Sequence, residues 1–225
     1  MLWDIDLTLV DYTGLGRKWY AEALANAVGK ELAHLPVFPG RTERSLAKEL
    51  LVAHGEAHDD EHVERILAEL EAIGLASRPD LPRLGRALDG AAEILAALRA
   101  RDGVVQSLVT GNIRTLADCK LAAFDLDRHV DLDIGGYGAL SEHRHDLVEA
   151  AMAQAAAKHG VPFASSSVVV IGDTPMDVAA GRHHGTVTVG VATGRHTVEQ
   201  LTESGADVVL PDLADTPAVL KALLP

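Results

Sequence analysis

The chain has 225 residues, 48% of them hydrophobic and only 4% aromatic, with a formal net charge of −13. Its size suits one domain with a modest insertion, and its acidic balance argues against nucleic-acid or anionic-membrane partners. Cys119 is the only cysteine, which excludes an internal disulfide, and no run approaches the ~20 apolar residues of a membrane span. We expect a cytoplasmic protein that acts on a small molecule as a monomer or homodimer.

The chain opens on a very short apolar run, Met1–Trp3, which we expect to be a strand that ends at Asp4. From residue 13 to residue 88 the pattern changes to successive helices joined by turns that contain Pro or Gly. The predicted helices cover residues 17–28, 43–54 and 61–73. This segment has no strand-like alternation, so we predict an all-helical lobe.

Beyond residue 88, short apolar runs alternate with helical patterns. Strands are predicted at 104–109, 130–134, 168–171, 187–191 and 207–210, and helices at 91–101 and 147–159. Strands that alternate with helices indicate a doubly wound parallel sheet with helices on both faces. The predicted fold is therefore an α/β, Rossmann-like core of residues 1–12 and 89–225, with an inserted helical domain of residues 13–88.

Polar residues gather where three of the predicted strands end. They supply four carboxylates, two threonine hydroxyls and a glycine-containing turn, namely Asp4, Asp6, Thr8, Thr110, Gly111, Asn112, Asp173 and Asp177. The carboxyl ends of parallel strands meet in one crevice where the strand order switches. Clustered carboxylates repel one another unless a cation is present, and oxygen ligands suit a hard ion such as Mg²⁺.

The turn Thr110-Gly111-Asn112 exposes N–H groups and a hydroxyl, as a phosphate site does. Together with the carboxylates it indicates phosphoryl transfer through an aspartyl-phosphate. Each piece alone is an ordinary feature, since acidic pairs cap helices and Thr-Gly-Asn is a common turn. The occurrence of all three at strand ends, in this order, favours a functional site.

With these motifs the chain resembles the haloacid dehalogenase (HAD) superfamily of hydrolases, within its phosphoglycolate-phosphatase-like branch. The resemblance covers essentially the whole chain and implies that the helical insertion is a cap. It implies that Asp4 is the nucleophile, and that Asp6 protonates the leaving alcohol and then activates water. Thr110 would bind phosphoryl oxygens with the amides of Gly111 and Asn112.

The resemblance also implies a Mg²⁺ site. Its ligands would be Asp4, the backbone carbonyl of Asp6, and Asp173, with Asp177 supporting the water ligands of the metal. We expect Thr8 among the phosphate-binding residues. In this branch a cap loop like Gly-Arg-Thr faces the active site, so Arg41 and Thr42 are candidate substrate contacts. The equally open alternative is an N-cap threonine beside a surface arginine.

Two positions depart from the family pattern. Leu7 stands where the family usually has glycine. The basic residue expected before the helix that leads to the fourth strand, usually Lys followed by Pro, is absent. Arg144 is our first choice for that role, because a guanidinium could bridge Asp4 and phosphate with two parallel hydrogen bonds. Lys120 is the alternative, and His143 and His145 are remote options.

The presence of Asp6 separates two chemistries of the superfamily. An alkoxide leaving group needs a proton and a halide does not, so Asp6 favours phosphoester cleavage over dehalogenation. Phosphoglycolate is the first substrate suggested by the resemblance. A phosphomutase of the β-phosphoglucomutase type would share the same core residues. A non-catalytic protein on this fold would normally have lost Asp4, Asp6 or Asp173.

Other histidines have simpler explanations. His54, His58 and His62 recur at four-residue spacing, which on one helix could bind a metal. Gly55 and the acidic residues that follow predict a helix end between them, so a solvated face is favoured. The pair at 183–184 is predicted to end a helix.

Overall fold

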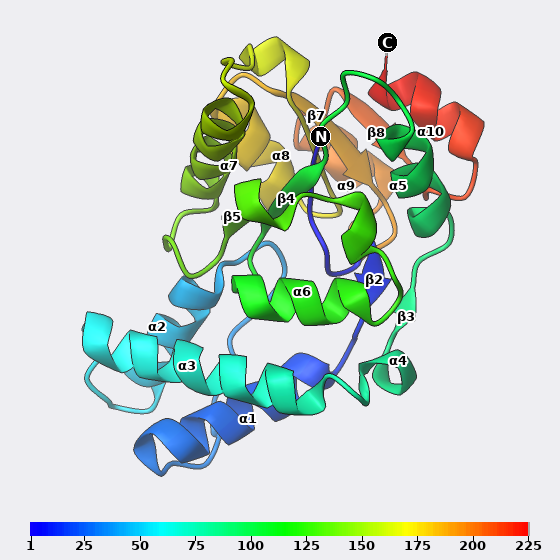
Figure 1. The fold of residues 1–225 in the computed structure, drawn as a ribbon. Helices are drawn as coiled ribbons and strands as arrows, with labels where there is room; N and C mark the ends of the chain where they lie inside the picture. The colour runs from blue at the N-terminus through cyan, green and yellow to red at the C-terminus, as the bar shows by residue number, and fades with distance from the viewer. Residues whose placement is uncertain (225) are drawn as a thin grey trace.

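The computed structural model describes residues 1–224, and its core is one six-stranded parallel sheet (Figure 1). The strand order is β5-β4-β1-β6-β7-β8. The strands are β1 (Leu2–Trp3), β4 (Ser107–Thr110), β5 (Gly136–Tyr137), β6 (Val169–Gly172), β7 (Val187–Val191) and β8 (Val208–Leu210). Leu2 of β1 lies opposite Ser107 on one side and Val170 on the other. The predicted parallel α/β fold is confirmed.

Helices cover both faces of the sheet because successive strand residues point in opposite directions. Helices α7 (Arg144–His159) and α8 (Pro175–His183) pack on one face, where Val170 joins a small apolar cluster with Leu147. Its neighbour Ile171 belongs to the larger core on the other face. That side is covered by α5 (Ala91–Arg99) and α10 (Thr216–Leu223), at the right of Figure 1.

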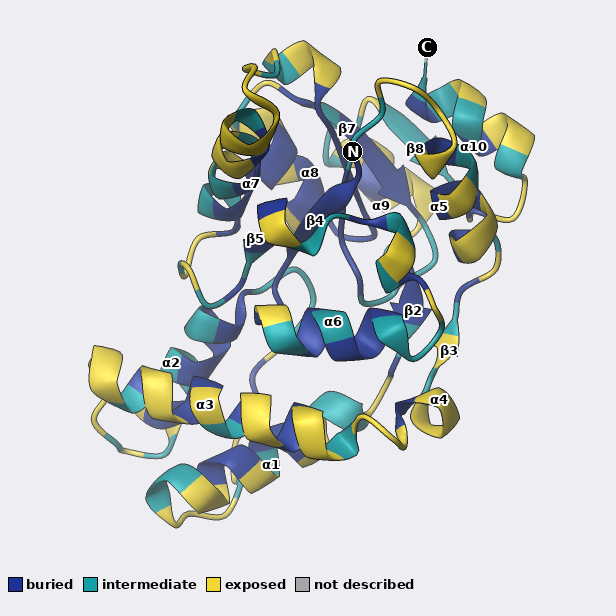
Figure 2. Cartoon of the chain, in the orientation of Figure 1, coloured by how far each residue is buried: buried dark blue, intermediate teal, exposed yellow. Residues whose placement is uncertain are grey.

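The inserted segment forms α1 (Leu15–Val28), α2 (Glu43–Ala53), α3 (Asp60–Ser77) and the short α4 (Leu81–Leu84). In Figure 1 these helices form a layer below the sheet, with α6 (Arg114–Ala122) lying between α3 and the strands. The inner sides of these helices are buried and their outer sides exposed (Figure 2). Helix α9 (Val198–Glu203) packs beside β7 and β8.

Two very short strands that we did not predict join the sheet and the helical layer. Strand β2 (Val10–Asp11) pairs antiparallel with β3 (Arg86–Ala87). The segment that leaves the sheet for the helical layer therefore lies beside the segment that returns from it. Two residues are too few to produce a periodic pattern in the sequence. The pair lies close to both ends of the segment 13–88, and this domain division itself remains a prediction.

The strand predicted at 130–134 is wrong. Residues Leu132–Ile134 form a 3₁₀ helix, and the edge strand β5 begins at Gly136. The side chain of Asp131 accepts a hydrogen bond of 3.0 Å from the N–H of Asp133, which stabilises the turn instead of a sheet ladder. The predicted strand at 104–109 begins only at Ser107, and its first three residues lie outside the sheet.

The helix boundaries near the histidines agree with the predictions. Helix α2 ends at Ala53, Gly55 has a φ of 71°, and Asp59 caps the start of α3. The three regularly spaced histidines therefore do not share one helix. Within residues 1–224, no helix has both the length and the apolar character needed to span a bilayer.

Candidate active site

The polar residues at the strand ends meet where the strand order of the sheet reverses. Strand β1 lies between β4 and β6, so the chain leaves β1 on one side and later returns on the other. A cavity of about 410 Å³ opens at the carboxyl ends of these three strands. The loops after the strands line one side of it, and α1 with the loop before α2 lines the other.

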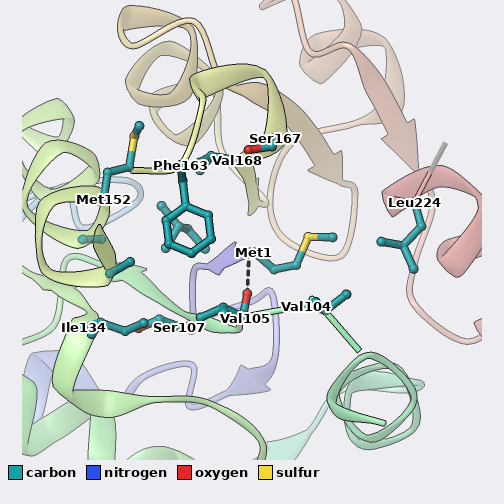
Figure 3. A pocket seen from close by; sticks show the side chains of 14 residues that line it. Met1, Val104, Val105, Ser107, Ile134, Met152, Phe163, Ser167, Val168 and Leu224 are labelled. Atoms are coloured by element: carbon teal, nitrogen blue, oxygen red, sulfur yellow. Dashed lines mark hydrogen bonds between the residues drawn. The ribbon is translucent and has the colours of Figure 1, made fainter. Parts of the chain in front are cut away.

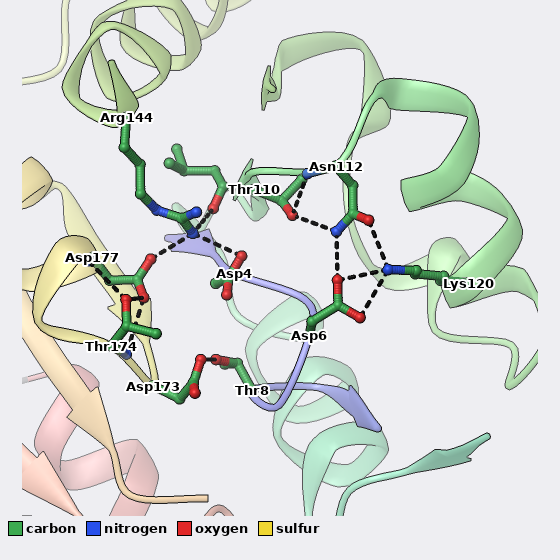
Figure 4. Close-up of polar contacts among 11 residues, drawn as sticks. Asp4, Asp6, Thr8, Thr110, Asn112, Lys120, Arg144, Asp173, Thr174 and Asp177 are labelled. Carbon is green, nitrogen blue, oxygen red and sulfur yellow. Dashed lines mark hydrogen bonds and ion pairs between the residues drawn. The ribbon is translucent and has the colours of Figure 1, made fainter. Parts of the chain in front are cut away.

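Asp4 and Arg144 form a buried ion pair at the centre of the site (Figure 4). Nη2 of Arg144 lies 2.8 Å from Oδ1 of Asp4 and 2.5 Å from Oδ1 of Asp177. Asp4 is only 7% exposed, and burial raises its pKa to about 6 although Arg144 acts to lower it. Burial disfavours the charged guanidinium, but Asp177 and Asp4 raise the pKa of Arg144 above its usual value and keep it cationic.

Asp177 is fixed from a second direction by its own helix. Its Oδ2 accepts hydrogen bonds from the N–H and the hydroxyl of Thr174, at 3.1 and 2.7 Å. This is a capping box at the start of α8, with Pro175 in the first turn. The local sequence Thr-Pro-Met-Asp therefore holds the carboxylate before any ligand binds.

Three buried carboxylates fit a divalent cation. Oxygen atoms of Asp4, Asp173 and Asp177 all lie within 4.8 Å of one another. Burial, together with the charges of Asp4 and Asp177, raises the pKa of Asp173 to about 9. Such mutual repulsion is relieved by a cation, and carboxylate oxygens are the ligands that Mg²⁺ prefers. The side chain of Asp6 lies outside this group.

Asp6 instead belongs to a separate polar network on the side of helix α6. Lys120 of α6 donates hydrogen bonds to both carboxylate oxygens of Asp6, at 2.8 and 2.6 Å, and to Oδ1 of Asn112 at 2.7 Å. Nδ2 of Asn112 donates to Asp6 at 2.8 Å and to the hydroxyl of Thr110 at 2.9 Å. The structure thus brings both candidate basic residues into the site and pairs them with different aspartates.

The remaining predicted core residues differ in how close they come to the cavity. Thr110, Gly111 and Asn112 line it. A Cβ on Gly111 would lie 1.9 Å from the carbonyl oxygen of Arg41, so only glycine permits this approach of two loops. Thr8 is fully buried beneath the site, with its hydroxyl 3.5 Å from Oδ1 of Asp173, and it is not part of the cavity wall.

His143 and His145, the remote options, also lie outside the cavity wall. Their rings stack on each other with centroids 5.5 Å apart, and the ring of His145 stacks on that of His183.

Arg41 and Thr42 occupy different environments. Arg41 lines the cavity, but its guanidinium hydrogen-bonds to Glu49 at 2.7 Å and to the hydroxyl of Ser45 at 3.1 Å. Thr42 is the N-cap of α2, since its side chain accepts from the N–H of Ser45 at 3.2 Å, and it does not line the cavity. For Thr42 the geometry therefore agrees with the capping alternative.

Sequence reasoning missed one pair of residues of this site. Glu43 and Tyr20 line the cavity and hydrogen-bond to each other. The acidic residue directly after Arg41-Thr42 was the one available signal.

Leu7, which departs from the family pattern, has an unusual backbone conformation. Leu7 has a φ of 60°, in the left-handed region, which explains why glycine is usual at this position in the family that the chain resembles.

A second cavity, of about 220 Å³, lies at the amino ends of the strands (Figure 3). Its wall is apolar apart from Ser107, Ser167 and the amino group of Met1, which donates to the carbonyl of Val105 at 2.8 Å. Burial lowers the pKa of this amino group to about 5. Because it lacks clustered catalytic groups, this cavity does not compete with the site at the carboxyl ends.

Comparison with known proteins agrees with the motifs. A family model described as HAD-hydrolase-like matches residues 146–216. The structure is similar to that of a hydrolase from Pseudomonas syringae, with 25% identity, a TM-score of 0.70, and coverage of 100% of this chain and 98% of that one. No curated protein matched the chain.

Two further solved structures share the fold. A HAD family hydrolase from Deinococcus radiodurans R1 is 23% identical, with a TM-score of 0.56 and coverage of 99% of this chain and 94% of that one. A predicted phosphoglycolate phosphatase from Haemophilus somnus 129pt is 19% identical, with a TM-score of 0.61 and coverage of 96% and 95%. Together with the family model, these matches confirm the resemblance to the HAD superfamily.

Proposed function

We propose that this HAD-like chain is a Mg²⁺-dependent phosphatase that hydrolyses a small phosphomonoester through an aspartyl-phosphate on Asp4. One observation carries the proposal: Asp4 stands at the end of β1, paired with the Arg144 cation and within 4.8 Å of the two further buried carboxylates, Asp173 and Asp177. A HAD family structure with the same fold, from Deinococcus radiodurans, contains bound phosphate and sodium, which supports phosphate as the ligand.

In the first step a carboxylate oxygen of Asp4 attacks phosphorus and the bond to the leaving alcohol breaks. Arg144 orients Asp4 and presents its other nitrogen atoms to the phosphoryl oxygens. Asp6 gives a proton to the leaving oxygen. Asp6 then removes a proton from the water that hydrolyses the acyl phosphate, which restores both aspartates. Lys120 and Asn112 hold the Asp6 carboxyl in position for both steps.

Mg²⁺ would be held by Asp4, Asp173 and the backbone carbonyl of Asp6, with Asp177 supporting its water ligands. When bound, it would offset the negative charge of the phosphoryl group. The phosphate itself would be held by Thr110 and by the backbone N–H groups of the loop that follows it.

We further propose that residues 13–88 act as a cap that closes over the site. The N–H groups of Glu43 and Arg44, at the start of α2, donate to the carbonyls of Gly111 and Gly138 at 2.8 and 3.0 Å. The first bond joins the start of α2 directly to the loop Thr110-Gly111-Asn112, and the second joins it to the loop after β5. Closure of this kind would exclude water from the leaving group.

The test is phosphate release from a panel of small phosphomonoesters, with Mg²⁺ and with excess chelator. We expect Mg²⁺-dependent release by the wild type, none by Asp4→Asn, and normal release by Asp102→Asn, an exposed aspartate outside the cavity. Absence of release from every ester would contradict the proposal. Turnover of a sugar phosphate without net phosphate release would instead indicate the phosphomutase alternative.

A further inference from the structure

One buried carboxylate in the cavity has no part in the mechanism above. Glu43 is the first residue of α2 and is only 8% exposed, yet it lines the same cavity as Asp6 and Lys120. The hydroxyl of Tyr20 donates a hydrogen bond to its Oε2. Within residues 1–224 this is the one hydrogen bond that the Glu43 carboxyl makes, so Oε1 is available to a ligand.

Within residues 1–224 no cation that lines the cavity forms an ion pair with Glu43. Lys120 is occupied by Asp6 and Asn112, and Arg41 by Glu49. Burial raises the pKa of Glu43 to about 7, while the Tyr20 hydrogen bond and the charge of Lys120 act to lower it. Near neutral pH the carboxyl is therefore able both to accept and to donate a hydrogen bond. A hydroxyl group matches this ability, because it also donates and accepts.

The walls next to Glu43 are largely apolar. They are formed by Trp19, Tyr20, Phe38 and Leu46, and the ring of Phe38 meets that of Tyr20 edge-on with centroids 5.1 Å apart. Trp19, Tyr20 and Leu46 are themselves buried. A carbon skeleton can pack on these walls, and Glu43 is the polar group that they surround.

We infer that Glu43 is a specificity residue that hydrogen-bonds a hydroxyl of the leaving alcohol, so that the enzyme prefers phosphomonoesters of small polyols over those of hydroxy acids. The inference rests on the proposed function and replaces phosphoglycolate, the first substrate that the family resemblance suggests. A carboxylate on the leaving group would lie beside the buried Glu43, and the ionised form of Glu43 repels it. A leaving group without a hydroxyl would leave a buried polar group without a ligand partner.

The test compares three esters of similar size: glycerol 1-phosphate, propyl phosphate and 2-phosphoglycolate. The wild type should have a kcat/KM for glycerol 1-phosphate about tenfold or more above the other two. Glu43→Leu should lower kcat/KM for glycerol 1-phosphate about tenfold, mainly through KM, and leave propyl phosphate within about twofold. Glu43→Gln should keep the preference over propyl phosphate but accept 2-phosphoglycolate better, because it keeps the hydrogen bonds without the charge.

Two further variants test whether the changes in kcat/KM come from a general disturbance of the structure. Tyr20→Phe removes the hydroxyl that orients Glu43 and should produce a smaller loss, again confined to glycerol 1-phosphate. Glu22→Gln, an exposed site on α1 outside the cavity, should leave all three values unchanged.

Preference of the wild type for 2-phosphoglycolate, or an equal loss on all three esters in Glu43→Leu and Tyr20→Phe, would overturn the inference while the phosphatase proposal stood. Phosphate release from none of the esters would reject the phosphatase proposal itself.

Discussion

The hydroxyl of Thr193, in the loop after β7, donates a hydrogen bond of 2.6 Å to the backbone carbonyl of Leu7. Leu7 lies between Asp6 and Thr8, and its φ of 60° is costly for a residue with a Cβ. A second bond, 2.7 Å from the N–H of Leu7 to the carbonyl of Val10, closes the same turn. A residue 186 positions away along the chain therefore helps to hold the turn that carries Asp6.

This relationship predicts a coupling between the two residues. Thr193→Val should lower the free energy of unfolding by about 1–2 kcal/mol, because it removes a hydrogen bond to a strained turn. In a Leu7→Gly background the same substitution should cost less, because glycine adopts the left-handed conformation unaided. Urea denaturation of the four proteins measures the coupling as a double-mutant cycle. Equal costs in both backgrounds would show that Thr193 does not stabilise the Leu7 conformation.

The Asp4–Arg144–Asp177 contacts predict a large effect of removing the cation. Arg144→Ala should lower the free energy of unfolding by about 3–5 kcal/mol, because it leaves two buried carboxylates without their partner. It should also abolish measurable phosphate release. Arg144→Lys keeps the charge but not the planar guanidinium, so we expect a smaller loss of stability than in Arg144→Ala, together with reduced turnover. If Arg144→Ala kept wild-type stability, Arg144 would not be the group that stabilises the buried Asp4 and Asp177.

The proposed role of Asp6 predicts a dependence on the leaving group. Asp6→Asn should lower kcat about a hundredfold or more with alkyl phosphates, whose alkoxide needs a proton. With p-nitrophenyl phosphate, whose leaving group is a weak base, the loss in the first step should be much smaller. Single-turnover measurements on both esters separate this step from hydrolysis of the acyl phosphate. Equal losses on the two esters would mean that Asp6 does not act as the acid.

The buried carboxylates predict opposite effects of Asp173→Asn with and without metal. Without Mg²⁺ the variant should be more stable than the wild type, because it removes repulsion that raises the pKa of Asp173 to about 9. Adding Mg²⁺ should stabilise the wild type, by about 2.7 kcal/mol at a hundred times its Kd, and leave the variant almost unchanged. Thermal unfolding at pH 8 measures both. A wild type that does not respond to Mg²⁺ would argue against the proposed metal site.

Glu43 predicts a pH dependence of stability whose sign is fixed. Its pKa rises on folding from 4.5 to about 7, so the folded state binds the proton more tightly than the unfolded chain does. The contribution of Glu43 to the free energy of unfolding is therefore fully present below pH 4.5 and is lost as the pH rises through 7. The loss is about 3 kcal/mol at most. Relative to the wild type, Glu43→Gln should gain stability between pH 5 and pH 8, measured by urea denaturation without divalent cations. If the difference in stability between the two proteins stayed the same from pH 5 to pH 8, the raised pKa of Glu43 would be contradicted.

Much of the site was available from the sequence because it is encoded locally. Asp4 and Asp6 follow an apolar run directly, Thr110 and Asn112 follow another, and the Thr174-to-Asp177 segment contains its own helix cap. Each motif lies within a few residues of the strand that positions it. Parallel strands necessarily bring such ends together, so the order of the motifs sufficed to predict the crevice.

The edges of the fold were less predictable. Residues 130–134 are apolar enough to suggest a strand, but side-chain hydrogen bonds of Asp131 favour a 3₁₀ turn. Strands β2 and β3 consist of two residues each and exist only because the chain crosses twice at the same place. The local hydrophobic pattern carries no information about either the 3₁₀ turn or the pairing of β2 with β3.

The sequence by itself determined the α/β class, the helical insertion and the strand-end carboxylates, because hydrophobic period and motif order are local properties. Only the tertiary structure decided which cation meets which aspartate. Arg144 reaches Asp4 from α7, while Lys120 reaches Asp6 from α6 across 114 positions of sequence. It also placed Glu43 in the cavity wall. Such pairings depend on how helices pack against the sheet and against one another, and that packing is set by the whole core.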